Sequence, residues 1–132
     1  MKRIITFILT AAIVLLLCAC GQTETDENAS YTSISAEEAK RIMDTEKDFI
    51  ILDVRTAEEF SEGHIPGAML IPDYEIEEKV EERLKDKEQT ILVYCRSGRR
   101  SKIAAETLSE LGYTNIKEFG GIIDWPYETT KK

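Results

Sequence analysis

The chain has 132 residues, and its 17 basic and 25 acidic side chains give a formal charge of −8 at pH 7. This acidic balance argues against a surface that binds nucleic acid or docks electrostatically on anionic lipid. It also makes any local cluster of arginines informative.

Residues 1–19 have the pattern of a targeting segment. Two basic residues precede the apolar run Ile4 to Leu17, and the stretch closes on the letters LCAC. The pattern resembles a bacterial lipoprotein signal peptide, with Leu17 and Ala19 placed before the acceptor Cys20. That resemblance implies cleavage before Cys20, acylation of its sulfur, and a lipid anchor on the extracytoplasmic face of the cell membrane, in a periplasm or at the outer cell surface. An uncleaved membrane anchor is the alternative, although the apolar run is shorter than the roughly 20 residues of a spanning helix.

The rest of the chain divides into a tether, one domain and a short tail. Residues 20–33 are the modified cysteine and a polar, acidic stretch with few aliphatic side chains, which indicates a flexible tether. Residues 34–128 are predicted to form one domain, because about 95 residues suffice for a single hydrophobic core. Residues 129–132 are assigned to a C-terminal tail.

Helices and strands are expected to alternate along the domain. Two capping boxes, SAEE from Ser35 and TAEE from Thr56, each indicate a helix start. Continuous apolar runs are typical of buried parallel strands. The alternation predicts an α/β fold, with a central, mainly parallel sheet of about five strands and helices on both faces. The predicted helices cover residues 35–43, 56–61, 73–85 and 102–112, and the predicted strands cover residues 49–54, 68–71, 90–94 and 116–119, followed by a turn and a short helix.

The cysteine content narrows the possible chemistry. If Cys18 is removed with the signal peptide and Cys20 is acylated, Cys95 remains as the free thiol. One thiol cannot form an internal disulfide. Together with the imidazole of His64 it supplies too few ligands for an ordinary zinc site, so no metal is expected. Cys95 is therefore either an inert buried thiol or a functional group.

Cys95 opens the segment CRSGRRS, which lies between a buried strand and a helix. Parallel sheets bind ligands at the carboxyl ends of their strands. The segment contains no proline, so each residue after Cys95 offers a backbone N–H. Gly98 permits a tight curl, and the following helix adds the positive end of its dipole. Such a loop suits an anion, and here the anion can be a thiolate. The three arginines of the segment would attract an anionic reactant.

Five short motifs occur in a recognisable order along the domain. They are DVR (Asp53 to Arg55), EEF (Glu58 to Phe60), GHIPGA (Gly63 to Ala68), CRSGRRS (Cys95 to Ser101) and GGIIDW (Gly120 to Trp125). Together they resemble the single-domain rhodanese pattern over about residues 35–128. The resemblance implies a rhodanese-like fold.

The resemblance also implies sulfur transfer without a metal or an organic cofactor. The Cys95 thiolate would take the outer sulfur of a small anionic donor, such as thiosulfate, a polysulfide or a persulfide. The persulfide formed on Cys95 would pass this sulfur to cyanide or a thiol. Any of the three arginines can be the one that faces the donor. The implied substrate-binding residues are Arg96, Ser97, Gly98, Arg99, Arg100 and Ser101.

Four residues outside the loop are expected to support the site rather than to react. Asp53 and Arg55 follow a buried strand and would brace the loop after it. Glu59 lies four residues beyond Arg55 and is its predicted ion-pair partner. His64 lies in the turn GHIPGA, where we expect its ring to bond a backbone carbonyl group, the alternative role being that of a general base.

Three alternative functions stay open. A phosphatase or arsenate reductase of the same fold needs an arginine six positions after the nucleophile, where this chain has Ser101. A non-catalytic binding module is the second, and the presence of Cys95 argues against it. The third is a persulfide carrier that delivers sulfur to a partner protein, which shares its first half-reaction with the enzyme. The chain is expected to be a monomer.

Overall fold

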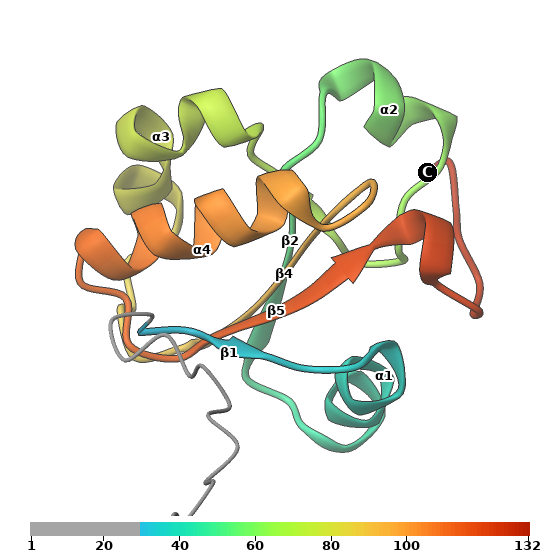
Figure 1. The fold of residues 1–132 in the computed structure, drawn as a ribbon, viewed down its shortest axis with the longest axis horizontal. Coiled ribbons are helices and arrows are strands. Elements are labelled where there is room, and N and C mark those ends of the chain that lie inside the picture. The colour runs from blue at the N-terminus through green and yellow to red at the C-terminus, as the bar shows by residue number, and fades with distance from the viewer. Residues whose placement is uncertain (1–29) are drawn as a thin grey trace, which may run out of the picture.

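The computed structural model describes residues 30–132, which form a parallel sheet between layers of helices (Figure 1). The predicted signal peptide, Cys20 and the tether up to residue 29 lie outside the described residues. No helix within residues 30–132 is long and apolar enough to cross a membrane. The strands are β1 (Thr32–Ser33), β2 (Phe49–Asp53), β3 (Met69–Leu70), β4 (Thr90–Cys95) and β5 (Ile116–Gly121), the helices are α1 (Ala36–Thr45), α2 (Ala57–Glu62), α3 (Ile76–Arg83) and α4 (Arg99–Glu110), and the short 3-10 helices are η1 (Asp73–Glu75) and η2 (Ile122–Asp124).

The strands form one sheet in the order β1-β5-β4-β2-β3, and every neighbouring pair is parallel. A helix lies between each strand and the next along the chain, because parallel neighbours cannot be joined by a tight turn. The predicted α/β fold is confirmed. Since all strands run the same way, their carboxyl ends meet at one edge of the sheet, and Cys95 ends β4 at that edge.

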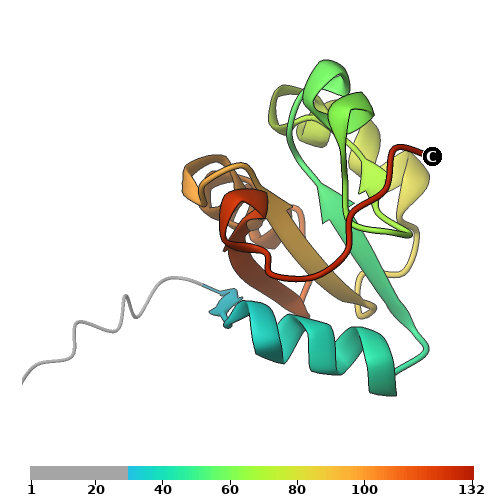
Figure 2. The ribbon, with the colours of Figure 1, turned by 90° about the vertical axis from the view of Figure 1, so that its right-hand side faces the viewer.

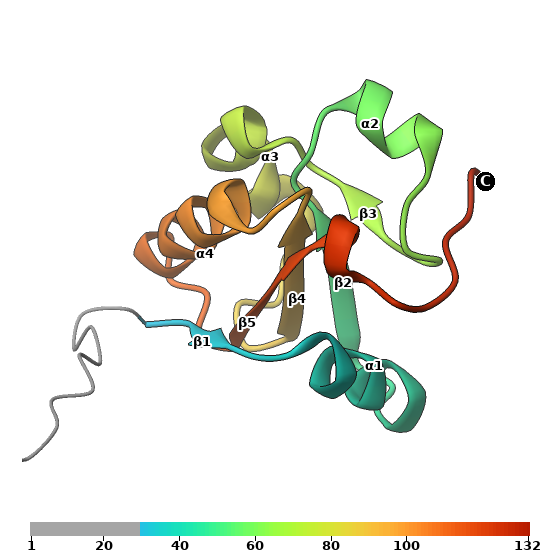
Figure 3. The same cartoon turned by 45° about the vertical axis from the view of Figure 1, so that its right-hand side comes forward.

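Alternate side chains of the central strand β4 pack on opposite faces of the sheet. Ile91, Val93 and Cys95 belong to the core shared with α3 and α4, whereas Leu92 and Tyr94 belong to the core shared with α1. Figures 2 and 3 show α1 on one side of the sheet and α3 and α4 on the other. Both faces of β4 are therefore covered, which explains its unbroken apolar sequence.

Helix α4 begins three residues earlier than the sequence predicts. Gly98 is the N-cap residue with a φ of +104°, and Arg99 is the first helical residue. The first turn is polar because it carries two arginines, so it resembled a loop in the sequence. As a result, the second half of the CRSGRRS segment is helical. The helix buries Ser101, Ala104, Ala105 and Leu108.

Backbone pairing among the described residues reaches beyond both predicted ends of the domain. Thr32 and Ser33, which were assigned to the tether, form β1 because their backbone groups pair with the free edge of β5. Thr130, which was assigned to the tail, exchanges two backbone hydrogen bonds of 2.8 Å with His64. Both corrections involve backbone pairing of short polar segments, which leaves little trace in the sequence.

Candidate active site

Cys95 lies at the carboxyl end of β4 with its sulfur turned toward the start of α4. The residue is 1% exposed. The backbone N–H of Gly98 donates to Sγ over 3.0 Å, and the hydroxyl oxygen of Ser101 lies 3.4 Å from Sγ. The Gly98 N–H is thus directed at the sulfur, whereas the thiol donates to the Ser101 hydroxyl oxygen. A hydrogen bond donated to the charged form of a thiol stabilises that form.

The first turn of α4 supplies further donors beside the sulfur. The N–H groups of Arg99, Arg100 and Ser101 have no acceptor one turn earlier, because the helix begins at Arg99. These groups and the helix dipole favour negative charge at this helix end. The predicted anion-binding loop is therefore a helix N-terminus with Cys95 placed before it.

The backbone of the loop lies directly on the corner between β5 and η2. A Cβ atom on Gly121 would stand 2.0 Å from the carbonyl oxygen of Arg96. The N–H of Ile123 donates to that same oxygen over 3.2 Å. Gly121 therefore lets the two backbones touch, and the corner holds the shape of the loop.

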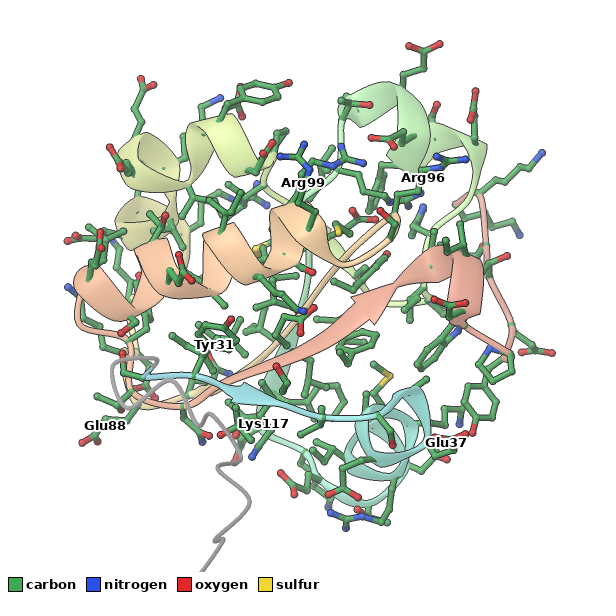
Figure 4. All side chains as sticks on the ribbon, viewed as in Figure 1. Tyr31, Glu37, Glu88, Arg96, Arg99 and Lys117 are labelled. Atoms are coloured by element: carbon green, nitrogen blue, oxygen red, sulfur yellow. The ribbon has the colours of Figure 1, made fainter. Side chains whose placement is uncertain are left out.

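The three arginines of the loop are not equivalent. Arg100 forms a bidentate ion pair with Glu59, with both nitrogen–oxygen distances 2.8 Å. The hydrogen bonds that Arg100 donates to Glu59 raise the pKa of Arg100, and the charge of Cys95 adds to this effect. Arg96 and Arg99 are exposed, and Figure 4 shows both at the end of α4 that faces α2. Arg96 and Arg99 are therefore free to meet an incoming anion, whereas Arg100 is held against α2.

The predicted ion pair between Arg55 and Glu59 is wrong. Glu59 turns to Arg100 and also caps α2, accepting the backbone N–H of Thr56 over 2.9 Å. The hydrogen bonds from Arg100, with smaller help from Thr56, lower the pKa of Glu59 to about 2. Arg55 instead folds back onto Asp53, two residues earlier.

Asp53 and Arg55 form a buried brace beside the site, as predicted. The Nη2 atom of Arg55 lies 2.7 Å from Oδ2 of Asp53 and 2.7 Å from the carbonyl oxygen of Gly63. The hydroxyl of Tyr94 donates to the same Asp53 oxygen over 2.6 Å and accepts the N–H of Ile65 over 3.1 Å. This network ties the GHIPGA turn to β2 and β4.

The pKa shifts in this network follow from its burial and its charges. Burial alone would lower the pKa of Arg55, but the hydrogen bonds and charge of Asp53 outweigh it and raise that pKa. Burial, followed by the Asp53 charge, raises the pKa of Tyr94. Both groups therefore keep their protons at neutral pH, which suits a structural role.

His64 contacts the backbone, as predicted for a turn residue. Its Nδ1 atom lies 2.9 Å from the carbonyl oxygen of Phe60, and its Nε2 atom lies 2.9 Å from the main-chain oxygen of Lys132. The ring stacks on that of Phe60 with centroids 3.7 Å apart. These contacts position the turn and the last described residues, and none of them involves Cys95.

Sequence reasoning missed Glu118, a buried carboxyl group behind the cysteine. It is 2% exposed and lies on β5. Its Oε1 atom accepts hydrogen bonds from the Ser101 hydroxyl and the Gly120 N–H, both over 2.7 Å. Ser101 is fully buried, and its hydroxyl donates to Glu118. The alternation with Ile116, two residues earlier on the same strand, was a signal that could have revealed Glu118.

Two hollows in the described surface relate differently to Cys95. A larger one of about 980 Å³ is mainly apolar and is lined by α1, the start of β2 and residues 125–128, with no residue of the cysteine loop. A smaller one of about 340 Å³ is lined by Arg55, Glu59 and Arg96 among others. The smaller hollow is the better approach for an inorganic anion, because it adjoins the loop and carries arginines.

Comparison with known proteins places this geometry in a family. The family described as rhodanese-like domain matches residues 35–126. The chain is 42% identical over 73 residues to thiosulfate sulfurtransferase PspE of Escherichia coli, covering 55% of this chain and 70% of PspE. It is 36% identical over 110 residues to the putative sulfur carrier protein YrkF of Bacillus subtilis, covering 83% of this chain and 58% of YrkF. A solved structure described as rhodanese with anions from E. coli superposes with a TM-score of 0.60 at 38% identity, covering 64% of this chain and 99% of that one.

Proposed function

This chain belongs to the rhodanese family and is a rhodanese-type sulfurtransferase, and we propose that it takes sulfane sulfur from thiosulfate onto Cys95. The observation that carries the proposal is the placement of Cys95. Its sulfur lies before the N-terminus of α4 and accepts the Gly98 N–H over 3.0 Å, and the exposed side chains of Arg96 and Arg99 belong to the same loop and helix start. The name of the relative PspE supports thiosulfate as the donor.

The reaction consists of two transfers at one sulfur atom. The Cys95 thiolate attacks the outer sulfur of thiosulfate and forms a new S–S bond. The old S–S bond breaks, and its electron pair leaves with sulfite. Cyanide or a thiolate then attacks the outer sulfur of the Cys95 persulfide, forms thiocyanate or a new persulfide, and returns the thiolate to Cys95. Each half-reaction ends before the next begins, so ping-pong kinetics are expected.

The loop residues have separate parts in this reaction. Arg96 and Arg99 attract the divalent donor and contact its oxygens, because their guanidinium groups are exposed. The unpaired N–H groups of the first turn of α4 stabilise the anionic persulfide. Arg100 keeps α4 and α2 together through Glu59, so it acts on the site by position and by its charge.

The alternative functions fit the geometry less well. A phosphatase needs a free guanidinium six positions after the nucleophile, but that position is the buried Ser101, and the neighbouring Arg100 is held by Glu59. A binding module has no use for a thiol placed before a helix N-terminus. A persulfide carrier that serves a protein acceptor is the second candidate, since the relative YrkF is described as a putative sulfur carrier. The rate with a protein persulfide acceptor compared with cyanide separates the two.

We also propose that the domain is held by a lipid anchor on the extracytoplasmic face of the membrane, which the pattern Leu17, Ala19 and Cys20 supports. In this proposal the sulfurtransferase domain is a monomer at the end of the tether. At that location the domain would meet sulfur compounds outside the cytoplasm.

The test is the intact mass of the purified chain after brief exposure to thiosulfate, with and without cyanide. We expect a gain of about 32 Da, one sulfur atom, that cyanide removes. Cys95→Ser should gain nothing while its far-UV circular dichroism stays that of the wild type. Loading by polysulfide but not by thiosulfate would reject the donor. Loading of Cys95→Ser, or no loading of the wild type by either donor, would reject the mechanism.

A further inference from the structure

Glu118 is a buried carboxyl group without a basic partner. No lysine or arginine of residues 30–132 forms an ion pair with it. Its recorded hydrogen bonds come from the Ser101 hydroxyl and the Gly120 N–H, and more distantly from the Ser33 hydroxyl at 3.4 Å. Burying a charge is costly unless the charge is both paired and hydrogen-bonded, and Glu118 has hydrogen bonds but no ion-pair partner among the described residues. A carboxyl group in this position gains by taking up a proton.

Ser101 connects Glu118 to the catalytic sulfur. Its Oγ atom lies 2.7 Å from Oε1 of Glu118 and 3.4 Å from Sγ of Cys95. A hydroxyl has one proton to donate and lone pairs to accept with. The carbonyl oxygens of Gly98 and Gly120 also lie near Oγ, at 3.0 and 3.3 Å, but the carboxyl oxygen is the nearest acceptor. The three side chains form a continuous, buried hydrogen-bonded line, since none is more than 2% exposed.

We propose that Glu118 receives the thiol proton of Cys95 through Ser101. The S–H proton passes to Oγ of Ser101 while the Ser101 hydroxyl proton passes to Oε1 of Glu118. One S–H and one O–H bond break, two O–H bonds form, and the net charge of the three groups stays at −1. The hydrogen bonds then run in reverse, with the Glu118 hydroxyl donating to Ser101 and the Ser101 hydroxyl donating to the thiolate. The inference deepens the proposed function, because the thiolate is the group that attacks the donor.

The charges around the line favour this movement. Arg96, Arg99 and Arg100 lie on the sulfur side. Two acidic groups near the loop are paired with arginines: Glu59 with Arg100, and Asp53 with Arg55. The charge of Asp73 in η1 also helps to raise the pKa of Arg100. At the Glu118 end of the line, β1 provides the Ser33 hydroxyl and β5 provides the Gly120 N–H as hydrogen-bond donors to the carboxyl group.

The arginine charges therefore lie at the Cys95 end of the line, and no basic side chain of residues 30–132 pairs with Glu118 at the other end. A carboxylate and a thiolate held together in this dry site would repel each other, and sharing one proton avoids that cost.

The variant Glu118→Gln tests the proposal, because glutamine keeps the shape and can accept the same hydrogen bonds but cannot take up a proton. Alkylation of Cys95 by iodoacetamide, followed by mass spectrometry across pH, reports the thiolate without needing a sulfur donor. In the wild type we expect a rate that changes little between about pH 6 and pH 8, since the proton moves within the protein. In Glu118→Gln the alkylation rate should fall about tenfold for each unit by which the pH is lowered across this range. At high pH it should reach the rate of the wild type.

Glu106→Gln is the matched control, since it makes the same change of charge at an exposed position of α4 and should leave the profile unchanged. Ser101→Ala should reproduce Glu118→Gln, and Ser101→Thr, which keeps the hydroxyl, should restore the wild-type profile. Circular dichroism confirms that each variant is folded. If Glu118→Gln reacts as fast as the wild type or faster at neutral pH, Glu118 is a repelling charge and the proposal is wrong. If the alkylation profiles behave as expected but thiosulfate does not load Cys95, the proposed donor fails and the proton path stands.

Discussion

Replacing Gly121 by alanine should distort the active-site loop while leaving the rest of the fold in place. Gly121 has an ordinary φ of −131°, so the alanine is strained only by contact. Its Cβ would lie 2.0 Å from the Arg96 carbonyl oxygen, 2.3 Å from the carbonyl carbon and 2.5 Å from Cα of Ser97. Non-bonded atoms need about 3 Å or more, so the loop must retreat by about 1 Å.

The size of the effect follows from that displacement. Overpacking of this kind costs about 1–3 kcal/mol, and losing the hydrogen bond from Ile123 to Arg96 adds about 1 kcal/mol. For a domain of this size, 1 kcal/mol lowers the melting temperature by about 4–8 °C, so a total cost of about 2–4 kcal/mol should lower it by about 10–30 °C. A shift of about 1 Å at the loop should slow sulfur loading of Cys95 by about 100-fold.

Thermal unfolding and the rate of sulfur loading measure the two effects of Gly121→Ala. The matched control is Gly112→Ala, where φ is +93° and the nearest atom to the new Cβ is a side-chain carbon of Lys87 at 3.6 Å. This variant has backbone strain without a clash and lies away from the loop. It should lose about 1–2 kcal/mol and keep its loading rate. If Gly121→Ala melts and loads like the wild type, the corner does not shape the loop.

Two further predictions concern the Glu59 carboxylate and the N-terminal cysteine. The pKa of Glu59 is lowered from 4.5 to about 2, chiefly by Arg100, so its contribution is complete above pH 4.5 and is lost as the pH falls through about 2. Urea unfolding should show the wild type losing about 1–3 kcal/mol more than Glu59→Gln across this interval, after allowance for solvent screening at a part-exposed pair, and equal losses would refute the pair. Cys20→Ala should abolish incorporation of labelled fatty acid into the chain expressed in its host cells, and unchanged labelling would count against acylation of Cys20.

The sequence predicted the helices and strands that have a local signal, such as an apolar run or a capping box. The strands β2 and β4 are continuous apolar runs because both faces of each are covered, and Thr56 with Glu59 forms the complete capping box that the letters TAEE indicate. The edge strand β1 was not predicted, because it consists of two exposed residues that pair with β5 through their backbone. A segment without a buried face leaves no periodic pattern to read.

The site was predicted less completely than the fold, because its contacts join distant parts of the chain. Counting four residues from Arg55 suggested Glu59 as its partner, but Glu59 meets Arg100, 41 positions away, and Arg55 meets Asp53. Glu118 lies in the predicted strand 116–119, and nothing in the pattern of that strand indicated a role for it. Its burial depends on Ser101 arriving from α4, which the sequence of β5 alone does not reveal.

The parallel pairing of β1 with β5 separates the start of the described domain from the active site. The chain enters the sheet at Thr32, opposite Lys117 near the start of β5, whereas Cys95 pairs with Gly121 at the other end of that strand. At about 3.3 Å per residue, the four residues from Lys117 to Gly121 separate these two points by roughly 13 Å along the strand direction. The described chain therefore enters the sheet at the end of β5 opposite to the end that pairs with the cysteine, so residues before β1 and reactants at Cys95 meet the domain at opposite ends of its strands.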